Sequence, residues 1–311
     1  MSPAMRQWIK LCLLLIILIA VSVGPSPAAD KIKAVATFSV IGNMVTTVMG
    51  DRVELSTLVG PNGDTELYQP TLADGRTVAN ARVLFMNGLN DEFEPWLEGL
   101  LRQAAFNGTK VVVSRGAKTI EADDEFTPIG KPKAAAIDQH AWLDPRNAVV
   151  YVKNIADALA RTDPSNAAEY RQRAAAYTKE LQELNSWAKA ELAAVPTAKR
   201  RMITSHDSLR YLAHAFGVTL ISINGWTNKS EPSAAELAQL TDQIKRERIR
   251  ALFLDSITDP RTMQRIAQET GAAIGGTLYG DALSKPGGEA DTYIKMIRHN
   301  ISTIKAGLLK N

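Results

Sequence analysis

Four short segments of this 311-residue chain carry the residue types that bind metal ions or catalyse hydrolysis. They are residues 58–70, 140–145, 205–207 and 279–284. The first is a Gly/Pro-rich loop with two carboxylates, and the others contain histidine or aspartate. Imidazole and carboxylate groups bind divalent ions, and in hydrolases they act as bases and orienting groups. The segments therefore indicate either a metal site or a hydrolytic site.

The elements that must position these segments follow a βα alternation in both halves of the chain. Predicted strands are 32–38, 53–58, 83–86, 111–113, 202–204, 218–223, 251–254 and 272–275. Predicted helices include 41–49, 72–80 and 93–105, and one that opens with a capping box at Ser233 and Glu236. This alternation favours an α/β fold of two lobes, each a parallel sheet flanked by helices. Such sheets bind ligands beyond the carboxyl ends of their strands, so we expect a ligand cleft between the lobes.

A long helix is predicted between the two halves, since residues 164–194 are rich in Ala, Glu, Gln, Lys and Leu and contain no glycine. It would be roughly 45 Å long and would join the lobes as a rigid backbone. A coiled-coil dimer is the alternative, because apolar residues recur here at alternating spacings of four and three. They are Tyr170, Ala174, Tyr177, Leu181, Leu184 and Ala188. This seam is shorter than about three heptads and would pack equally well on the protein's own lobes, so we expect a monomer.

The amino-terminal residues 1–29 have the pattern of a cleaved secretory signal peptide. Two basic residues, Arg6 and Lys10, precede an apolar run from Leu11 to Val23, and small residues follow at 26–29. The run is shorter than the roughly 20 residues that cross a bilayer, which disfavours the alternative of an uncleaved membrane anchor. The single cysteine, Cys12, lies early in the run without a small-residue site before it, which disfavours a lipid anchor. We therefore expect a secreted, periplasmic protein without disulfides.

The composition of the mature chain permits two lobes and argues against a nucleic-acid partner. Without Arg6 and Lys10, 34 basic residues face 33 acidic ones, so no DNA-binding surface is predicted. About 280 residues suffice for two separate cores. The expected boundaries are 30–163 for the first lobe, 164–195 for the backbone helix and 196–311 for the second lobe.

The chain resembles the metal-binding receptors of bacterial zinc and manganese ABC importers, the helical-backbone periplasmic binding proteins of cluster A-I. The resemblance runs from end to end and rests on six motifs. They are Val59–Pro61 with Tyr68–Pro70, Asn87–Gly88 with Glu94–Leu97, His140–Pro145, Thr204–Asp207, Ser230–Ser233 and Leu278–Ser284. It implies a non-enzymatic solute-binding protein that delivers manganese, zinc or iron to an importer permease. It also implies that one ion is held between the lobes by one ligand from each of four segments, here Glu66, His140, His206 and Asp281.

The ligand set that this resemblance implies bears on which metal is bound. Glu66 stands where similar proteins usually carry histidine, and His206 stands where manganese receptors typically carry glutamate. Two carboxylates and two neutral imidazoles around a divalent ion give a neutral site, which can be buried. Carboxylate oxygens suit manganese and ferrous iron, and bidentate binding by Glu66 or Asp281 would exceed the tetrahedral arrangement of zinc. Zinc receptors of this kind often carry a His-rich stretch, and none lies between Leu67 and His140. We therefore expect manganese ahead of zinc and iron.

Several of these residues also have a structural interpretation. A lone histidine is usually a hydrogen-bonded structural residue, and we expect His214 and His299 to be structural or solvent-facing. Glu66 has the alternative of a solvated loop carboxylate. Asp144 is expected to cap the helix after it. Asp255 is expected either to orient His206 or to cap a following helix.

Two enzyme classes and one structural class compete with the receptor. His206, Asp207 and Ser208 are the residue types of a hydrolytic triad, but consecutive side chains cannot form one, and no Gly-x-Ser-x-Gly turn occurs. A metal-dependent hydrolase is the stronger rival. However, catalytic zinc usually keeps a position open for water, whereas four protein ligands close the shell. A surface adhesin would leave the four polar segments unexplained.

Overall fold

The structure of the protein, a computed structural model, describes residues 31–120, 137–222 and 233–311. The expected signal peptide lies outside these residues. So do residues 230–232 of one of the six motifs and the side chain of Glu236, one half of the expected capping box. None of the described helices is long and apolar enough to cross a membrane.

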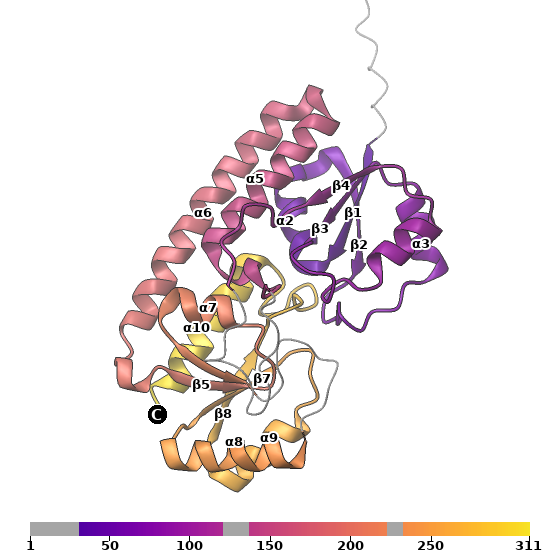
Figure 1. Cartoon of the computed structure of the whole chain (residues 1–311). Helices are drawn as coiled ribbons and strands as arrows, with labels where there is room; N and C mark the ends of the chain where they lie inside the picture. The colour runs from indigo at the N-terminus through magenta and orange to yellow at the C-terminus, as the bar shows by residue number, and fades with distance from the viewer. Residues whose placement is uncertain (1–30, 121–136, 223–232) are drawn as a thin grey trace, which may run out of the picture. The chain divides into compact units, whose positions relative to one another are not determined.

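The first half of the chain forms a parallel four-stranded sheet in the order β2-β1-β3-β4 (Figure 1). Its strands are β1 (Ile32–Phe38), β2 (Val53–Val59), β3 (Val83–Met86) and β4 (Thr109–Val112). Its helices are α2 (Ser39–Met49), α3 (Leu72–Ala79) and α4 (Leu97–Gln103). The predicted helix 93–105 begins only at Leu97, because the Glu94 carboxylate accepts hydrogen bonds from the backbone of Asn87 and Gly88 and holds the preceding residues in a turn.

The second half repeats the arrangement with a parallel sheet in the order β6-β5-β7-β8. Its strands are β5 (Arg201–Thr204), β6 (Thr219–Ser222), β7 (Ala251–Asp255) and β8 (Ala273–Leu278). Its helices are α7 (Arg210–Phe216), α8 (Ala234–Glu247), α9 (Arg261–Thr270) and α10 (Tyr293–Leu308). The predicted α/β class, with one helix-flanked parallel sheet in each half, is confirmed.

Both sheets bury two faces, because successive residues of a strand point to opposite sides. In β1, Phe38 packs with α2 in the main core, whereas Val35 packs in a smaller cluster with α3 and α4. In β7, Phe253 belongs to the main core and Leu252 to a third cluster with α8 and α9. The nearly continuous apolar runs in these strands are therefore those of parallel strands covered on both sides.

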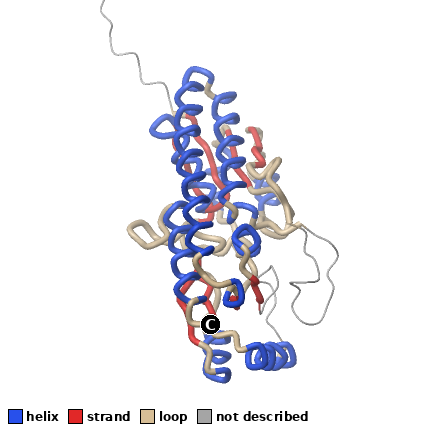
Figure 2. Tube along the Cα trace, turned by 90° about the vertical axis from the view of Figure 1, so that its left-hand side faces the viewer, coloured by secondary structure: helices blue, strands red, loops and turns tan. Residues whose placement is uncertain are grey.

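Two long helices, α5 (Pro145–Thr162) and α6 (Ala167–Ala193), lie side by side, and α6 continues to the second half, where it contacts α7 and α10 (Figures 1 and 2). The first turn predicted for α6 is instead a 3-10 turn at Pro164–Asn166, where Asp163 accepts hydrogen bonds from Ser165 and Asn166. The seam of α6 packs against α5, α2, α10 and α7 of the same chain. Its buried residues are Tyr170, Ala174, Tyr177, Leu181, Leu184, Ala188 and Leu192. Intrachain packing thus accounts for the alternating spacing of four and three.

One continuous cluster of buried apolar residues passes through both halves of the described chain. It contains Phe38 and Trp142 from the first half, Leu184 from α6, and Phe253 and Tyr293 from the second. The segments that carry the candidate ligands are packed onto this cluster. Their side chains are therefore held by core packing as well as by hydrogen bonds.

Candidate metal centre

The four candidate ligands emerge from different elements and are all buried. Glu66 follows β2, His206 follows β5 and Asp281 follows β8, while His140 directly precedes a 3-10 turn at Ala141–Leu143. The exposed fraction is 4% for Glu66, 0% for each histidine and 1% for Asp281. The interpretation of Glu66 as a solvated loop carboxylate is therefore wrong.

The structure places both candidate histidines between the Asp281 carboxylate and Glu66. His140 Nε2 lies 3.2 Å from Asp281 Oδ1, and His206 Nε2 lies 3.3 Å from Asp281 Oδ2. The two imidazole rings are 5.3 Å apart between centroids. Glu66 joins the histidines, since one potential ligand atom from each of these three residues lies within 4.8 Å of the others. The two histidines thus connect residues that are far apart in sequence, with Asp281 close to both and Glu66 close to both.

Several polar atoms at this point lack a hydrogen bond of good geometry in the described part of the chain. They include His140 Nε2 and both carboxylate oxygens of Asp281. Buried polar atoms are normally satisfied, because an unsatisfied one costs roughly 1 to 3 kcal/mol. A cation bound at this point would satisfy these nitrogen and oxygen atoms.

His140 is held in the tautomer that a metal requires. Its Nδ1 lies 2.8 Å from Asp138 Oδ1, which also accepts the backbone N–H of His140 at 2.9 Å. A carboxylate beside Nδ1 keeps a proton there, so that Nε2 is the nitrogen that can lose its proton and offer a lone pair to an ion. Tyr211 donates to the backbone carbonyl of Asp138 and secures the segment from α7. Asp138 was not predicted as a functional residue, although an aspartate two residues before a candidate ligand is a local signal that identifies it.

The Asp138→Asn variant is expected to bind manganese about 10- to 100-fold more weakly, because partners that orient metal-binding histidines contribute about that much affinity. The dissociation constant is measured by competition with a chelating dye. Asp91→Asn, at an exposed position of the same half, serves as the matched control and should leave the constant unchanged. Unaltered affinity in Asp138→Asn would show that His140 is oriented by other contacts.

His206 and Asp255 are positioned by the turns that follow β5 and β7. Thr204 Oγ1 donates to the backbone carbonyl of His206, which fixes the turn. Asp255 Oδ1 accepts the backbone N–H of Ile257, and Ser208 Oγ lies 3.4 Å from Asp255 Oδ2. The next helix, α9, is preceded by Asp259, whose carboxylate accepts the N–H of Arg261. The expectation that Asp255 caps a helix is therefore wrong, and a role in orienting His206 stays a prediction.

The charges at the site hold protons on both histidines in the metal-free protein. Burial alone would lower the pKa of His140, but the negative charges of Asp281 and Asp138 raise it well above its usual value. Burial likewise opposes protonation of His206, yet hydrogen bonding and charge from Asp281 raise its pKa to about 10. Burial would raise the pKa of Asp281, but both histidines lower it. An ionised carboxylate that attracts two imidazolium groups is an environment selective for positive charge.

The carboxylates beside these groups respond mainly to burial. Burial raises the pKa of Asp207 to about 7 and that of Asp255 to about 6. His206 turns its Nε2 towards Asp281, and Asp207 Oδ1 is 3.8 Å from His206 Nδ1, too far for a hydrogen bond. Ser208 Oγ donates a hydrogen bond to Asp255 and not to a histidine nitrogen. The residue types of a hydrolytic triad are thus present without the arrangement of a triad.

The predicted structural roles of the neighbouring residues agree with the structure. Asp144 accepts the N–H of Arg146 and caps α5. His214 is exposed, and His299 Nε2 makes a hydrogen bond with the carbonyl of Thr277. Trp142 is fully buried, with its ring centroid 5.3 Å from that of His140 and its Nε1 donating to Gly280. It keeps water from one side of the site.

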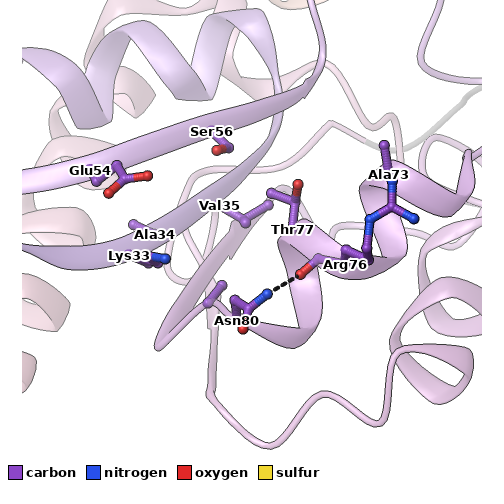
Figure 3. Close-up of a pocket in the computed structure, with 10 residues that line it drawn as sticks. Lys33, Ala34, Val35, Glu54, Ser56, Ala73, Arg76, Thr77 and Asn80 are labelled. Atoms are coloured by element: carbon purple, nitrogen blue, oxygen red, sulfur yellow. Dashed lines mark hydrogen bonds between the residues drawn. The ribbon is translucent and has the colours of Figure 1, made fainter.

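A groove of about 420 Å³ lies elsewhere in the first half, between α3 and the strands β1 and β2 (Figure 3). Charged and polar side chains line it, among them Lys33, Glu54 and Arg76. Asn80 Nδ2 donates to the carbonyl of Arg76 at its edge. The groove contains none of the four candidate ligands, so it is separate from the candidate metal centre.

Comparison with known families and proteins identifies similar chains over most of the length. The model of the family described as zinc-uptake complex component A, periplasmic (ZnuA) matches residues 34–307. The manganese-binding lipoprotein MntA of Halalkalibacterium halodurans is 30% identical over 92% of this chain and 91% of its own length. The iron ABC transporter substrate-binding lipoprotein MtsA of Streptococcus pyogenes serotype M1 is 31% identical over 91% of this chain and 90% of its own.

Solved structures show the same architecture. The manganese-bound periplasmic metal-binding protein of Candidatus Liberibacter asiaticus superposes with a TM-score of 0.78, is 29% identical and matches 90% of this chain and 100% of its own. The periplasmic zinc-binding protein TroA of Treponema pallidum has a TM-score of 0.81 and 26% identity, and it matches 90% of this chain and 99% of its own. These relatives differ in the metal that their names record.

Proposed function

The chain belongs to the family of periplasmic zinc-uptake component A, and from this premise we propose that it binds one divalent transition-metal ion through Glu66, His140, His206 and Asp281. It is a substrate-binding protein of a metal ABC importer. The observation that carries the ligand assignment is the buried Asp281 carboxylate, whose two oxygens face His140 Nε2 and His206 Nε2 at 3.2 and 3.3 Å.

The charge and hydrogen bonding of the site support this ligand set. A divalent ion would replace the protons on the two imidazoles and leave two neutral histidines with two carboxylates, so the buried site would be neutral. It would also satisfy the buried atoms of Asp281 and His140 that lack hydrogen bonds of good geometry in the described structure. Nε2 of His140 is the nitrogen that would bind the ion after losing its proton, because Asp138 lies against Nδ1 and holds the other proton there.

Manganese is the proposed cargo, ahead of zinc and ferrous iron. Two carboxylates provide the oxygen ligands that manganese accepts readily. Both oxygens of Asp281 face the site, so this residue can supply two donor atoms and raise the coordination number above the four that zinc prefers. Manganese is also the metal in the name of one relative, MntA, and in a solved structure of the family.

The proposed location is the periplasm, reached through a signal peptide at residues 1–29. The relatives MntA and MtsA are lipoproteins. In this chain the single cysteine, Cys12, stands inside the apolar run of the leader, so we propose cleavage after Ala29 and a mature protein without a lipid anchor. The mature protein, a monomer without catalytic activity or a nucleic-acid partner, would carry its ion to the importer permease.

One tightly held ion per chain is the expected result when metal-free protein is offered manganese, zinc and ferrous iron in competition. Native mass spectrometry gives the stoichiometry, and elemental analysis identifies the metal. Binding to the folded state alone adds about 2.7 kcal/mol of stability when the free ion is at 100 times its dissociation constant, so the melting temperature should rise with the bound metal. The exposed His214→Ala variant should behave as the wild type. If the protein retains no stoichiometric ion and its melting temperature is the same with every metal as without metal, the proposed receptor function is wrong.

A further inference from the structure

A carboxamide lies against one of the proposed ligands. Gln139 Nε2 donates to Glu66 Oε1 at 2.5 Å, across 73 residues of sequence. Both side chains are buried, with 1% of Gln139 and 4% of Glu66 exposed. A hydrogen bond to an ionised carboxylate is about twice as strong as one between neutral groups, and burial strengthens it further.

The main chain of Gln139 is itself firmly anchored. Its carbonyl accepts a hydrogen bond from Asn87 Nδ2 at 2.9 Å, and Asn87 Oδ1 accepts one from Tyr151 of α5 at 2.6 Å. Gln139 also stands between Asp138, which orients His140, and His140 itself. The carboxamide is thus attached to the same rigid segment that presents a histidine to the site.

The backbone of the loop that carries Glu66 is held as well. Asp64 Oδ1 accepts the backbone N–H groups of Glu66 and Leu67 at 2.9 and 3.1 Å. Trp96 Nε1 donates to the carbonyl of Thr65. These contacts fix where the Glu66 side chain begins, and the Gln139 carboxamide fixes one of the two oxygens at its end.

We propose, resting on the metal site proposed above, that Gln139 is a positioning residue that makes Glu66 bind the ion through one oxygen. Gln139 holds Oε1, so Glu66 presents its carboxylate to the ion in one orientation. Asp281 differs, because each of its oxygens faces a histidine nitrogen. The resulting donor set has one oxygen from Glu66, one nitrogen from each of the two histidines, and two oxygens from Asp281. Five donor atoms favour manganese over zinc, for which four suffice.

This role predicts a change in metal preference as well as in affinity. Gln139→Met keeps the length of the side chain and removes the donor. Manganese affinity should fall about 10- to 100-fold, the usual effect of losing a partner that orients a ligand. Zinc affinity should fall less, because zinc can be held by the remaining donors. The ratio of the two dissociation constants, measured with manganese and zinc salts against a chelating dye, is a quantity that a general loosening of the fold would not shift.

The experiment is a double-mutant cycle on the full mature chain. The four proteins are the wild type, Gln139→Met, Glu66→Ala and the double variant. If Gln139 acts through Glu66, its replacement costs no further manganese affinity once Glu66 is alanine. Gln103→Met, at an exposed position of α4, is the matched control and should match the wild type. Circular dichroism checks the fold, and Gln139→Leu replaces Gln139→Met if the latter does not fold.

Three outcomes separate the possibilities. An equal loss of manganese affinity on replacing Gln139 in both backgrounds would overturn the positioning role while leaving the receptor intact. Tighter manganese binding by Gln139→Met would overturn it too, because the carboxamide would then compete with the ion for Glu66. A wild type without any stoichiometric ion would instead refute the proposed function.

Discussion

Replacement of Asp281 by asparagine is expected to abolish stoichiometric manganese binding. The Asp281 carboxylate faces both histidine nitrogens, and it provides one of the two negative charges that neutralise a divalent ion. Removing one partner of a buried charge pair costs about 3 to 5 kcal/mol. That energy corresponds to a rise in the dissociation constant of roughly a hundredfold to several thousandfold. Elemental analysis after dialysis and isothermal titration calorimetry both measure the loss.

The matched control for this variant is Asp51→Asn, which makes the same substitution at an exposed position. It should retain one ion per chain. Asp281→Asn should also remain folded without metal, because asparagine has the same shape and the two imidazoles can become neutral once the negative charge is gone. If manganese affinity stayed within a few fold of the wild type, Asp281 would not be a ligand and the proposed set of four would be wrong.

The second large effect is that the stability of the metal-free protein and its affinity for metal should change with pH in opposite directions. The metal-free protein should become less stable as the pH rises from about 6.5 towards about 10. The pKa of an unfolded histidine is about 6.5, whereas the pKa of His206 is raised to about 10 and that of His140 is raised as well. In this range the folded protein binds more protons than the unfolded chain, so raising the pH favours unfolding. Below about pH 4 the lowered pKa of Asp281 works in the opposite sense, and its contribution is lost as the pH falls.

Metal binding should follow the reverse trend over the same range. An ion must displace the protons that Asp281 holds on the two imidazoles, so its affinity rises as those protons become easier to remove. Protons therefore compete with the ion for the two histidines at neutral pH and above, and not only near the ordinary histidine pKa of about 6.5. The stabilisation that manganese adds should increase with pH while the metal-free protein weakens.

Thermal unfolding with and without manganese, from about pH 6 to about pH 9, tests both trends in one experiment. A proton-release measurement by calorimetry in two buffers gives the number of protons displaced. His214→Ala should leave the pH dependence of the melting temperature unchanged both with and without manganese, since this histidine is exposed. A metal-free melting temperature and an affinity that were both independent of pH would show that His140 and His206 are not protonated in the metal-free site.

Much of the fold is predictable from local patterns. The strands were recognisable because β-branched runs such as 32–38 are bounded by helix and turn signals. The turn at Phe93–Trp96 was mistaken for helix, because the contact that forms it, between Glu94 and the backbone of Asn87 and Gly88, is tertiary. The seam of α6 was ambiguous for a related reason, since the spacing of its apolar residues does not identify what covers them.

The candidate site was predictable only in part. Its four side chains were identified through a resemblance, and both histidines lie close to Asp281 and to Glu66. The role of the four as ligands and the boundaries of the lobes stay predictions. Asp138 could have been found, because it contacts His140 two residues away. Gln139 could not have been found, because its function depends on Glu66, which lies in a distant loop. Sequence patterns report what a residue does locally and are silent about partners that only the fold supplies.

One apolar core runs through both sheets by way of α6, so we expect the two halves to unfold together. Neither half separated from the other would cover all the faces of α6 that the whole chain buries. The candidate ligands Glu66 and His140 lie before α6, and His206 and Asp281 lie after it, so the four meet only when the entire core has formed. A substitution such as Leu184→Ala would therefore reduce the amount of binding-competent receptor without contacting the ion at all.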